Sequence, residues 1–263
     1  MRLYTLGTCS GTEPMPGRRH TSWALEAEGG LYWFDAGEGC SYTAHLMGVD
    51  LLSLRSVVIS HPHIDHTGGL ANLFFNVVKL NGRLEEDSPR RLEGKVIRVL
   101  LPDPNVWVGV THLLGHGRGT SSAHGNFSTD ILADGPVFDD GIVAIEALHN
   151  AHLGVPAEGE PWRCFSFRVR AGGRTVVYSG DVRDVRELDP LLDGVDLLLM
   201  ETGHHQVEPV CEYLAERAPD LGRLAFIHHG RAILEDPEGQ LRLAQGILGD
   251  RVLITEDGMT LDL

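Results

Sequence analysis

The chain has 263 residues and a formal net charge of −15, from 22 basic and 37 acidic residues. This charge argues against a general binder of nucleic acids or anionic membranes, because both need a basic surface. Hydrophobic residues make up 42% and charged residues 22%, as in ordinary globular proteins, so we expect one domain over residues 1–263. The 14 histidines leave metal binding open.

The cysteines and the amino-terminal segment bear on the cellular compartment. The cysteines are widely spaced and form no C-x-x-C pair, which argues against both a disulfide framework and a cysteine zinc site. They are Cys9, Cys40, Cys164 and Cys211. We therefore expect reduced thiols and a cytoplasmic location. The first seven residues predict a strand rather than a signal peptide, and no apolar run is long enough to predict a membrane span.

Short apolar runs predict five strands in the first half of the chain. They cover Arg2–Leu6, Thr21–Ala27, Leu31–Asp35, Ser56–Ser60 and Val96–Leu101. Helices are predicted over Ser41–Met47, over Thr67–Leu80 and after Pro104. The Gly-, Ser- and His-rich segment His112–Asp130 is predicted to be a long surface loop. Its histidines, which we do not assign as metal ligands, are His112, His116 and His124.

The second half has the same organisation, with hairpin strands first and alternating strands and helices after them. Strands are predicted over Ile142–Leu148, Arg163–Ala171, Thr175–Ser179, Asp196–Met200, Arg223–Ile227, Arg251–Ile254 and Met259–Leu261. Helices are predicted over Val207–Arg217 and Pro237–Leu248. This order favours an α+β fold, a four-layer αββα sandwich in which two mixed β-sheets are flanked by helices.

The segment from Ser60 to His66, Ser-His-Pro-His-Ile-Asp-His, contains three imidazoles and a carboxylate within six residues, between a predicted buried strand and a helix. His61 and His63 are two residues apart in an extended turn, so both can face one ion. Asp65 and His66 suit a second ion. Nitrogen and oxygen ligands without thiolate suit zinc, with manganese and iron as alternatives. The segment therefore predicts a site for two divalent metal ions.

The pattern His61-x-His63-x-Asp65-His66 resembles the H-x-H-x-D-H signature of the metallo-β-lactamase superfamily. Further motifs follow in the order of that family: Phe34-Asp35-Ala36-Gly37, His152, Ser179-Gly180-Asp181 and His228. The opening Leu6-Gly7-Thr8-x-Ser10-Gly11 is most similar to the ribonuclease Z-like branch. The resemblance covers nearly the whole chain and implies a metallo-β-lactamase-like fold.

The resemblance also implies roles for individual residues. It places His61, His63 and His152 on one metal and Asp65, His66 and His228 on the other. It makes Asp181 the bridge between the two metals and Asp35 a buried carboxylate that orients the ligands.

Four of these assignments have rivals in the sequence. His149 competes with His152, and His229 competes with His228. Asp35 can instead cap a turn after its strand, and Asp181 can instead be a turn residue after Tyr178.

Two metal ions about 3.5–4 Å apart would share a water and turn it into a hydroxide nucleophile, which predicts a hydrolase. Asp65 can accept a proton from the attacking water. Protonation of the leaving group needs another residue, and His204 resembles the histidine that ribonuclease Z-like enzymes place near the leaving oxygen. The neighbouring His205 is the second choice, and a surface-turn histidine is the rival interpretation.

The substrate prediction depends on what this sequence lacks. Ribonuclease Z enzymes hold transfer RNA with an arm that is usually inserted between the third histidine and the bridging aspartate. Here only 29 positions separate His152 from Asp181, and the chain is acidic. We therefore expect a phosphodiesterase acting on a small anionic ester, with a tRNA 3′-end endonuclease as the alternative. Nucleic acid and a homodimer stay open as partners.

An iron-dependent oxidoreductase on the same fold is the alternative of another class. Diiron members usually have Glu where this chain has His63, so the histidine argues against it. The stretch Arg18-Arg19-His20 can either hold an anionic substrate near the metals or form an ordinary solvated pair.

Overall fold

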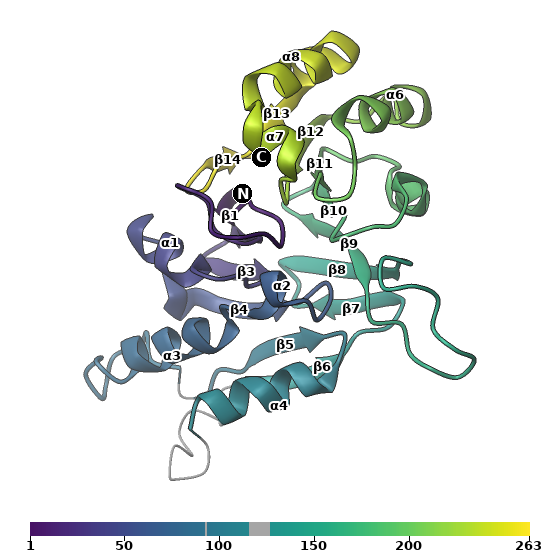
Figure 1. The fold of residues 1–263 in the computed structure, drawn as a ribbon. Coiled ribbons are helices and arrows are strands. Elements are labelled where there is room, and N and C mark those ends of the chain that lie inside the picture. Colours follow the sequence, from purple (N-terminus) through teal and green to yellow (C-terminus); the bar gives the residue numbers. More distant parts are fainter. Residues whose placement is uncertain (93, 116–126) are drawn as a thin grey trace.

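The computed structural model describes residues 1–92, 94–115 and 127–263. The chain forms two mixed, seven-stranded sheets that pack face to face, with helices on both outer faces (Figure 1). The predicted αββα sandwich is therefore confirmed.

The first sheet has the strand order β14-β1-β2-β3-β4-β5-β6. Its strands are β1 (Arg2–Gly7), β2 (Ser22–Ala27), β3 (Gly30–Phe34), β4 (Leu54–Val58), β5 (Ile97–Leu101), β6 (Phe127–Ile131) and β14 (Thr260–Asp262). The pairs from β14 to β3 are antiparallel, and those from β3 to β6 are parallel. Glu28 and Gly29, both with positive φ, join β2 to β3 in a two-residue hairpin turn.

The second sheet has the order β13-β12-β11-β10-β9-β8-β7. Its strands are β7 (Gly135–Asp139), β8 (Val143–His149), β9 (Phe165–Ala171), β10 (Arg174–Tyr178), β11 (Leu197–Glu201), β12 (Arg223–Ile227) and β13 (Val252–Ile254). The pairs from β7 to β10 are antiparallel, and those from β10 to β13 are parallel. In both sheets the parallel strands therefore place their carboxyl ends at one edge, where loops can converge.

The outer layers consist of helices from both halves of the chain. They are α1 (Cys40–Leu46), α2 (Ile64–Thr67), α3 (Leu70–Asn81), α4 (Pro104–Leu113), α6 (Val207–Arg217), α7 (Arg231–Glu235), α8 (Pro237–Leu248) and the short 3₁₀ helices Leu51–Ser53, Val185–Leu191 and Gly249–Arg251. None of the helices in the described part of the chain is long and apolar enough to cross a membrane.

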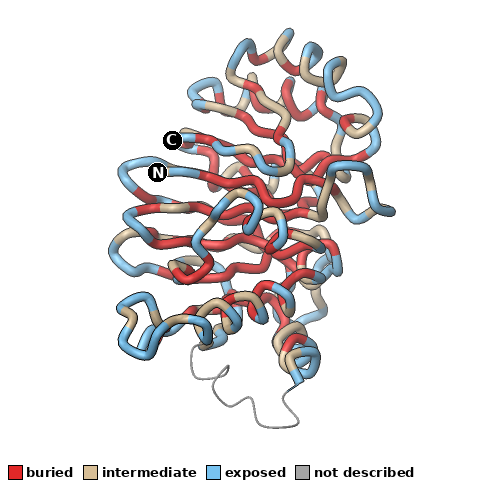
Figure 2. The backbone as a smooth tube through the Cα atoms, turned by 90° about the vertical axis from the view of Figure 1, so that its left-hand side faces the viewer, coloured by how far each residue is buried: buried red, intermediate tan, exposed pale blue. Residues whose placement is uncertain are grey.

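Three apolar cores hold the layers together. Figure 2 shows that the buried residues follow the strands and that the exposed ones gather in the connecting loops and on the helices. The central core lies between the sheets, where the rings of Trp23 and Phe34 stack at 4.1 Å and Phe167 of the other sheet packs edge-on against Phe34 at 6.2 Å. The two outer cores join each sheet to its own helices. Because a strand such as β3 packs against a core on each face, its sequence is a continuous apolar run.

Three sequence predictions about elements need correction. The loop predicted over His112–Asp130 is wrong at both ends, because His112 lies in α4 and Phe127 begins β6; residues 116–126, with His116 and His124, lie outside the described residues. The helix predicted over Thr67–Leu80 is interrupted at Gly68-Gly69, so that α2 and α3 are separate. Strand β7 was not predicted.

Candidate metal centre

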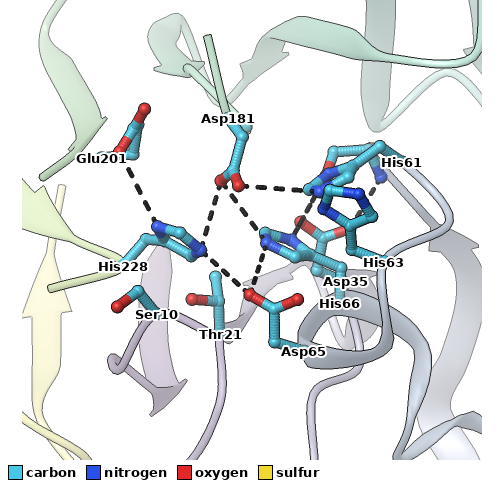
Figure 3. Close-up of polar contacts among 12 residues, drawn as sticks. Ser10, Thr21, Asp35, His61, His63, Asp65, His66, Asp181, Glu201 and His228 are labelled. Atoms are coloured by element: carbon cyan, nitrogen blue, oxygen red, sulfur yellow. Dashed lines mark hydrogen bonds and ion pairs between the residues drawn. The ribbon is translucent and has the colours of Figure 1, made fainter. Parts of the chain in front are cut away.

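The polar side chains singled out in the sequence meet at the carboxyl ends of the strands (Figure 3). They follow β3, β4, β8, β10 and β12 and comprise Asp35, His61, His63, Asp65, His66, His152, Asp181 and His228. Because parallel strands end at the same edge, residues more than 160 positions apart become neighbours: His228 Nε2 lies 3.2 Å from Asp65 Oδ2.

The donor atoms form two groups that could each hold a metal ion. One comprises His61, His63, His152 and Asp181, the other Asp65, His66 and His228, and within each group the atoms lie within 4.8 Å of one another. A third, overlapping group comprises Asp181, Glu201, His204 and His228. The first two sets are the two that the resemblance implies.

Asp181 faces both groups, one oxygen to each. Its Oδ2 lies 3.6 Å from His61 Nε2 and 3.7 Å from His152 Nε2. Its Oδ1 lies 3.4 Å from the Nε2 atoms of both His66 and His228. A carboxylate held in this way can bridge two cations.

The unpartnered atoms in this cluster fit a bound cation. In the described part of the chain, Nε2 of His61, His66 and His152 and Oδ1 of Asp181 are buried and have no hydrogen-bond partner. Buried polar atoms are rarely left unsatisfied in this way, and several lone pairs that converge on one point repel one another. Divalent ions with a preference for nitrogen and oxygen ligands, such as zinc, would satisfy them all.

Asp35 fixes the orientation of His66 and ties the two sheets together. Its Oδ2 lies 2.7 Å from His66 Nδ1, and it also accepts hydrogen bonds from Ser60 Oγ at 2.7 Å and from Tyr178 Oη of the second sheet at 2.6 Å. With Nδ1 directed at Asp35, Nε2 is the ring atom of His66 that faces the cluster. Asp35 has a φ of 51°, a backbone conformation that is uncommon outside glycine.

The mutual electrostatics of the cluster shift its pKa values strongly. Burial alone would raise the pKa of Asp181, but His228 and His66 outweigh it and hold this pKa well below its usual range. Burial lowers the pKa of His61 well below its usual value, which keeps that imidazole neutral. Neutral imidazoles and ionised carboxylates are the forms that bind metal ions.

The structure brings only one histidine of each competing pair into the cluster. The ring of His152 lies 5.0 Å from that of His61, whereas His149 binds Asp134 and stacks on Trp162 at 4.0 Å. In the other pair, His228 enters the cluster.

His229 points away from the cluster. Its Nε2 lies 2.8 Å from the carbonyl oxygen of Thr255, to which it donates, and burial lowers the pKa of His229 to about 3.

His204 lies at the rim of the cluster, and a glutamate that the sequence analysis did not single out holds it there. His204 Nδ1 donates to Glu201 Oε1 at 3.1 Å, and the ring lies 4.7 Å from that of His152. The neighbouring His205 donates to the carbonyl oxygen of Val182, and its Nε2 also lies 3.4 Å from Glu201 Oε1. Glu201 is fully buried at the end of β11, and its Oε2 lies 3.7 Å from His228 Nδ1. A carboxylate that directly follows the apolar run Leu197–Met200 was the signal available in the sequence.

The Arg18 side chain contacts the protein interior. Its guanidinium donates to Thr8 Oγ1 and to the carbonyl oxygen of Thr255, both at 2.9 Å. These bonds join the amino-terminal loop to the carboxyl-terminal segment, so Arg18 has a structural task.

Comparison with known proteins agrees with this geometry. A family model described as a beta-lactamase superfamily domain matches residues 34–255. The chain belongs to the beta-lactamase superfamily. Among solved structures, the metallo-beta-lactamase fold protein YhfI from Bacillus subtilis superimposes with a TM-score of 0.72 at 19% identity, covering 99% of both chains. The short form of human tRNase Z gives 0.69 at 20% identity, covering 100% of this chain and 99% of that one.

Curated relatives that match in sequence include several proteins named ribonuclease Z. The protein from Treponema pallidum is 38% identical over 73 residues, which is 28% of this chain and only 23% of that protein. The protein from Shouchella clausii is 27% identical over 315 residues, with 100% of this chain and 97% of that protein covered. Since this chain has 263 residues, that relative contains segments that this chain lacks.

Proposed function

We propose that this superfamily member is a metal-dependent hydrolase of phosphodiesters or related esters that uses two divalent metal ions, with zinc as the first choice. The observation that carries the proposal is the position of Asp181, one oxygen of which faces each donor group. When bound, two such ions lower the pKa of a water molecule and stabilise charge on an attacked phosphoryl group.

In this proposal His61, His63 and His152 would hold one ion, and Asp65, His66 and His228 the other, with Asp181 shared. Asp35 would keep Nε2 of His66 directed at the metal by accepting a hydrogen bond from Nδ1–H.

Two side chains would move protons. Asp65 Oδ2 would accept a proton from the attacking water. Gly11 leaves room for this carboxylate oxygen, because a Cβ at position 11 would lie 2.8 Å from it. His204 would protonate the leaving oxygen. The hydrogen bond to Glu201 raises the pKa of His204, although burial opposes this, and it occupies Nδ1, which leaves Nε2 as the atom that delivers the proton.

A small ester is favoured over transfer RNA as the substrate. The interval from His152 to Asp181 consists of a loop followed by β9 and β10, which leaves no additional segment for an RNA-holding arm. The net charge of −15 also opposes binding of a polyanion. The names of the sequence relatives favour the second candidate, a tRNA 3′-end endonuclease, and cleavage of a precursor tRNA at rates above those for small esters would establish it.

The test uses bis-p-nitrophenyl phosphate with metal-loaded protein. Metal analysis should find close to two ions per chain, and His152→Ala or Asp181→Ala should lower kcat/KM by at least a hundredfold and reduce the metal content. His149→Ala is the matched control, because that side chain contacts Asp134 outside the cluster. Full activity of the Asp181 variant, or loss of activity in the His149 variant alone, would contradict the assignment. If the protein cleaves only carboxylic or sulfate esters, the proposed substrate class is wrong and the assignment of the metal ligands still stands.

A further inference from the structure

A groove of about 380 Å³ lies between α2 and α4, beside the candidate metal centre. Its walls are mostly apolar, and the apolar side chains that line it are Pro62, Ile64, Ala71, Val106, Val110 and Leu113. Ile64 is 75% exposed and Leu113 is 79% exposed. Large aliphatic side chains gathered around a hollow, with this much surface in water, are typical of a binding site for apolar groups.

One wall of the α2–α4 groove begins next to a candidate metal ligand, since consecutive Cα atoms lie about 3.8 Å apart. Pro62 and Ile64 line it and flank His63 in the chain. The ring of His63 lies 4.6 Å from that of His61 and 5.3 Å from that of His152. A substrate whose reacting atom lies at the cluster would therefore extend its neighbouring substituent along α2 into this groove.

The charge of the groove selects against an anionic occupant. Of the described residues that line it, Asp103 is the one charged group, and none is a lysine or arginine. Burial raises the pKa of Asp103, but the N–H of Asn105 and the Arg163 guanidinium outweigh it, so the pKa is lowered and the carboxylate stays ionised. Asp103 is already paired with the Arg163 guanidinium at 3.0 Å, so the described lining residues offer a phosphate or carboxylate no unpaired cation.

We propose that the α2–α4 groove binds a neutral apolar substituent of the substrate, such as an aryl or branched alkyl group on the ester. This inference rests on the proposed function and narrows its substrate class to esters with one apolar arm.

Gly109 of α4 provides a way to fill the groove without touching the cluster. It lines the groove, and a Cβ built there meets no atom within 4 Å. Gly246 of α8 is also an exposed helix glycine with open space around its Cβ, and it lies outside the groove. Because a larger residue raises helix propensity at both positions, Gly109→Phe and Gly246→Phe form a matched pair.

The experiment compares methyl and benzyl p-nitrophenyl phosphate, which share their anion and their leaving group. We expect wild-type kcat/KM to be at least about tenfold higher for the benzyl ester than for the methyl ester, since filling an apolar pocket usually raises kcat/KM by about this factor or more. Gly109→Phe should abolish the preference and leave the methyl ester unaffected, whereas Gly246→Phe should retain it. Ile64→Ser, which removes an exposed apolar side chain, should weaken the preference as a second variant. Calorimetric titration with benzylphosphonate and methylphosphonate should show the same order in binding.

The outcomes separate the two proposals. If metal-loaded wild type hydrolyses neither ester, the proposed function is wrong, and the phosphonate titrations still test the groove. If both esters are hydrolysed with equal kcat/KM, or the preference survives in both Gly109→Phe and Ile64→Ser, the groove assignment is wrong. Thermal unfolding of each variant checks that it is folded.

Discussion

His204 and His205 are adjacent in the chain and have different surroundings, which makes them a test of the proposed general acid. Both side chains lie near Glu201, but the ring of His204 faces that of His152, whereas His205 Nε2 donates to the carbonyl oxygen of Val182. We expect His204→Ala to lower kcat by about 10²–10⁴ for an alkyl phosphodiester, the usual range for general acid catalysis. With p-nitrophenolate as the leaving group, which departs without a proton, the loss should be small.

The pH dependence gives an independent measurement for the same residue. Because the hydrogen bond to Glu201 raises the pKa of His204, its imidazole keeps its proton to a higher pH than an ordinary histidine, and catalysis through it declines as the pH rises past that raised pKa. This decline should be absent from the pH–rate profile of His204→Ala and present in that of His205→Ala. Equal losses in both variants for alkyl and p-nitrophenyl esters would indicate a structural role instead.

The residues of the candidate centre differed in how far the sequence could reveal them. The dense segment His61–His66 carries its own signal, because its donors are neighbours in the chain. His152, Asp181 and His228 came from the resemblance alone, since their proximity depends on the ends of separate strands. Glu201 and Tyr178 were missed because each acts through another side chain; the position of Glu201 after an apolar run is a weak signal, and Tyr178 within such a run has none.

At the scale of elements, α4 and α8 each start from an Asp-Pro pair, in which the aspartate is the N-cap. Comparing the two helices therefore separates the contribution of an N-cap to stability from that of an ion pair. Asp103 Oδ1 accepts from the N–H of Asn105, and Asp236 Oδ1 accepts from that of Gly239. Only Asp103 also binds Arg163, at 3.0 Å. Loss of an N-cap costs about 1 kcal/mol, so Asp236→Ala should lower the free energy of unfolding by that amount, and Asp103→Ala by more.

Denaturant unfolding of both alanine variants checks this prediction. Asp103→Asn serves as the control, because it keeps an N-cap acceptor and removes the charge that faces Arg163, so its cost should lie between those of wild type and Asp103→Ala. Equal costs at the two positions would mean that the contact with Arg163, which joins α4 to the loop before β9, adds nothing to stability.

The element predictions succeeded where burial produces a pattern and failed where it does not. β3 and β11 are buried along their whole length, and both were predicted as apolar runs. In the edge strand β7 only Phe138 is buried, so the sequence contains no alternation to detect. Residues 127–130 were included in a loop for the same reason, because β6 is also an edge strand and has no buried residue.

At the scale of the whole molecule, the candidate centre joins the two halves of the sandwich. His61, Asp65 and His66 follow the first sheet, and Asp181 and His228 follow the second. The layered architecture was predictable from the order of strands and helices. The convergence of the ligands was not, because it arises from the packing of two sheets whose parallel strands end at one edge.

This arrangement predicts that metal ions stabilise the whole fold. A ligand that binds only the folded state at a hundredfold excess over its Kd stabilises it by about 2.7 kcal/mol, so two such ions should add roughly 5 kcal/mol to the free energy of unfolding. Chelation should therefore lower the denaturant midpoint and the Tm, and zinc should restore both. Asp181→Asn weakens both sites, so its unfolding should depend far less on metal, whereas His149→Ala should respond like wild type. If chelation leaves the wild-type midpoint unchanged while metal analysis shows that the ions are gone, the ions do not hold the two sheets together, and the unpartnered imidazole nitrogens are stable without them.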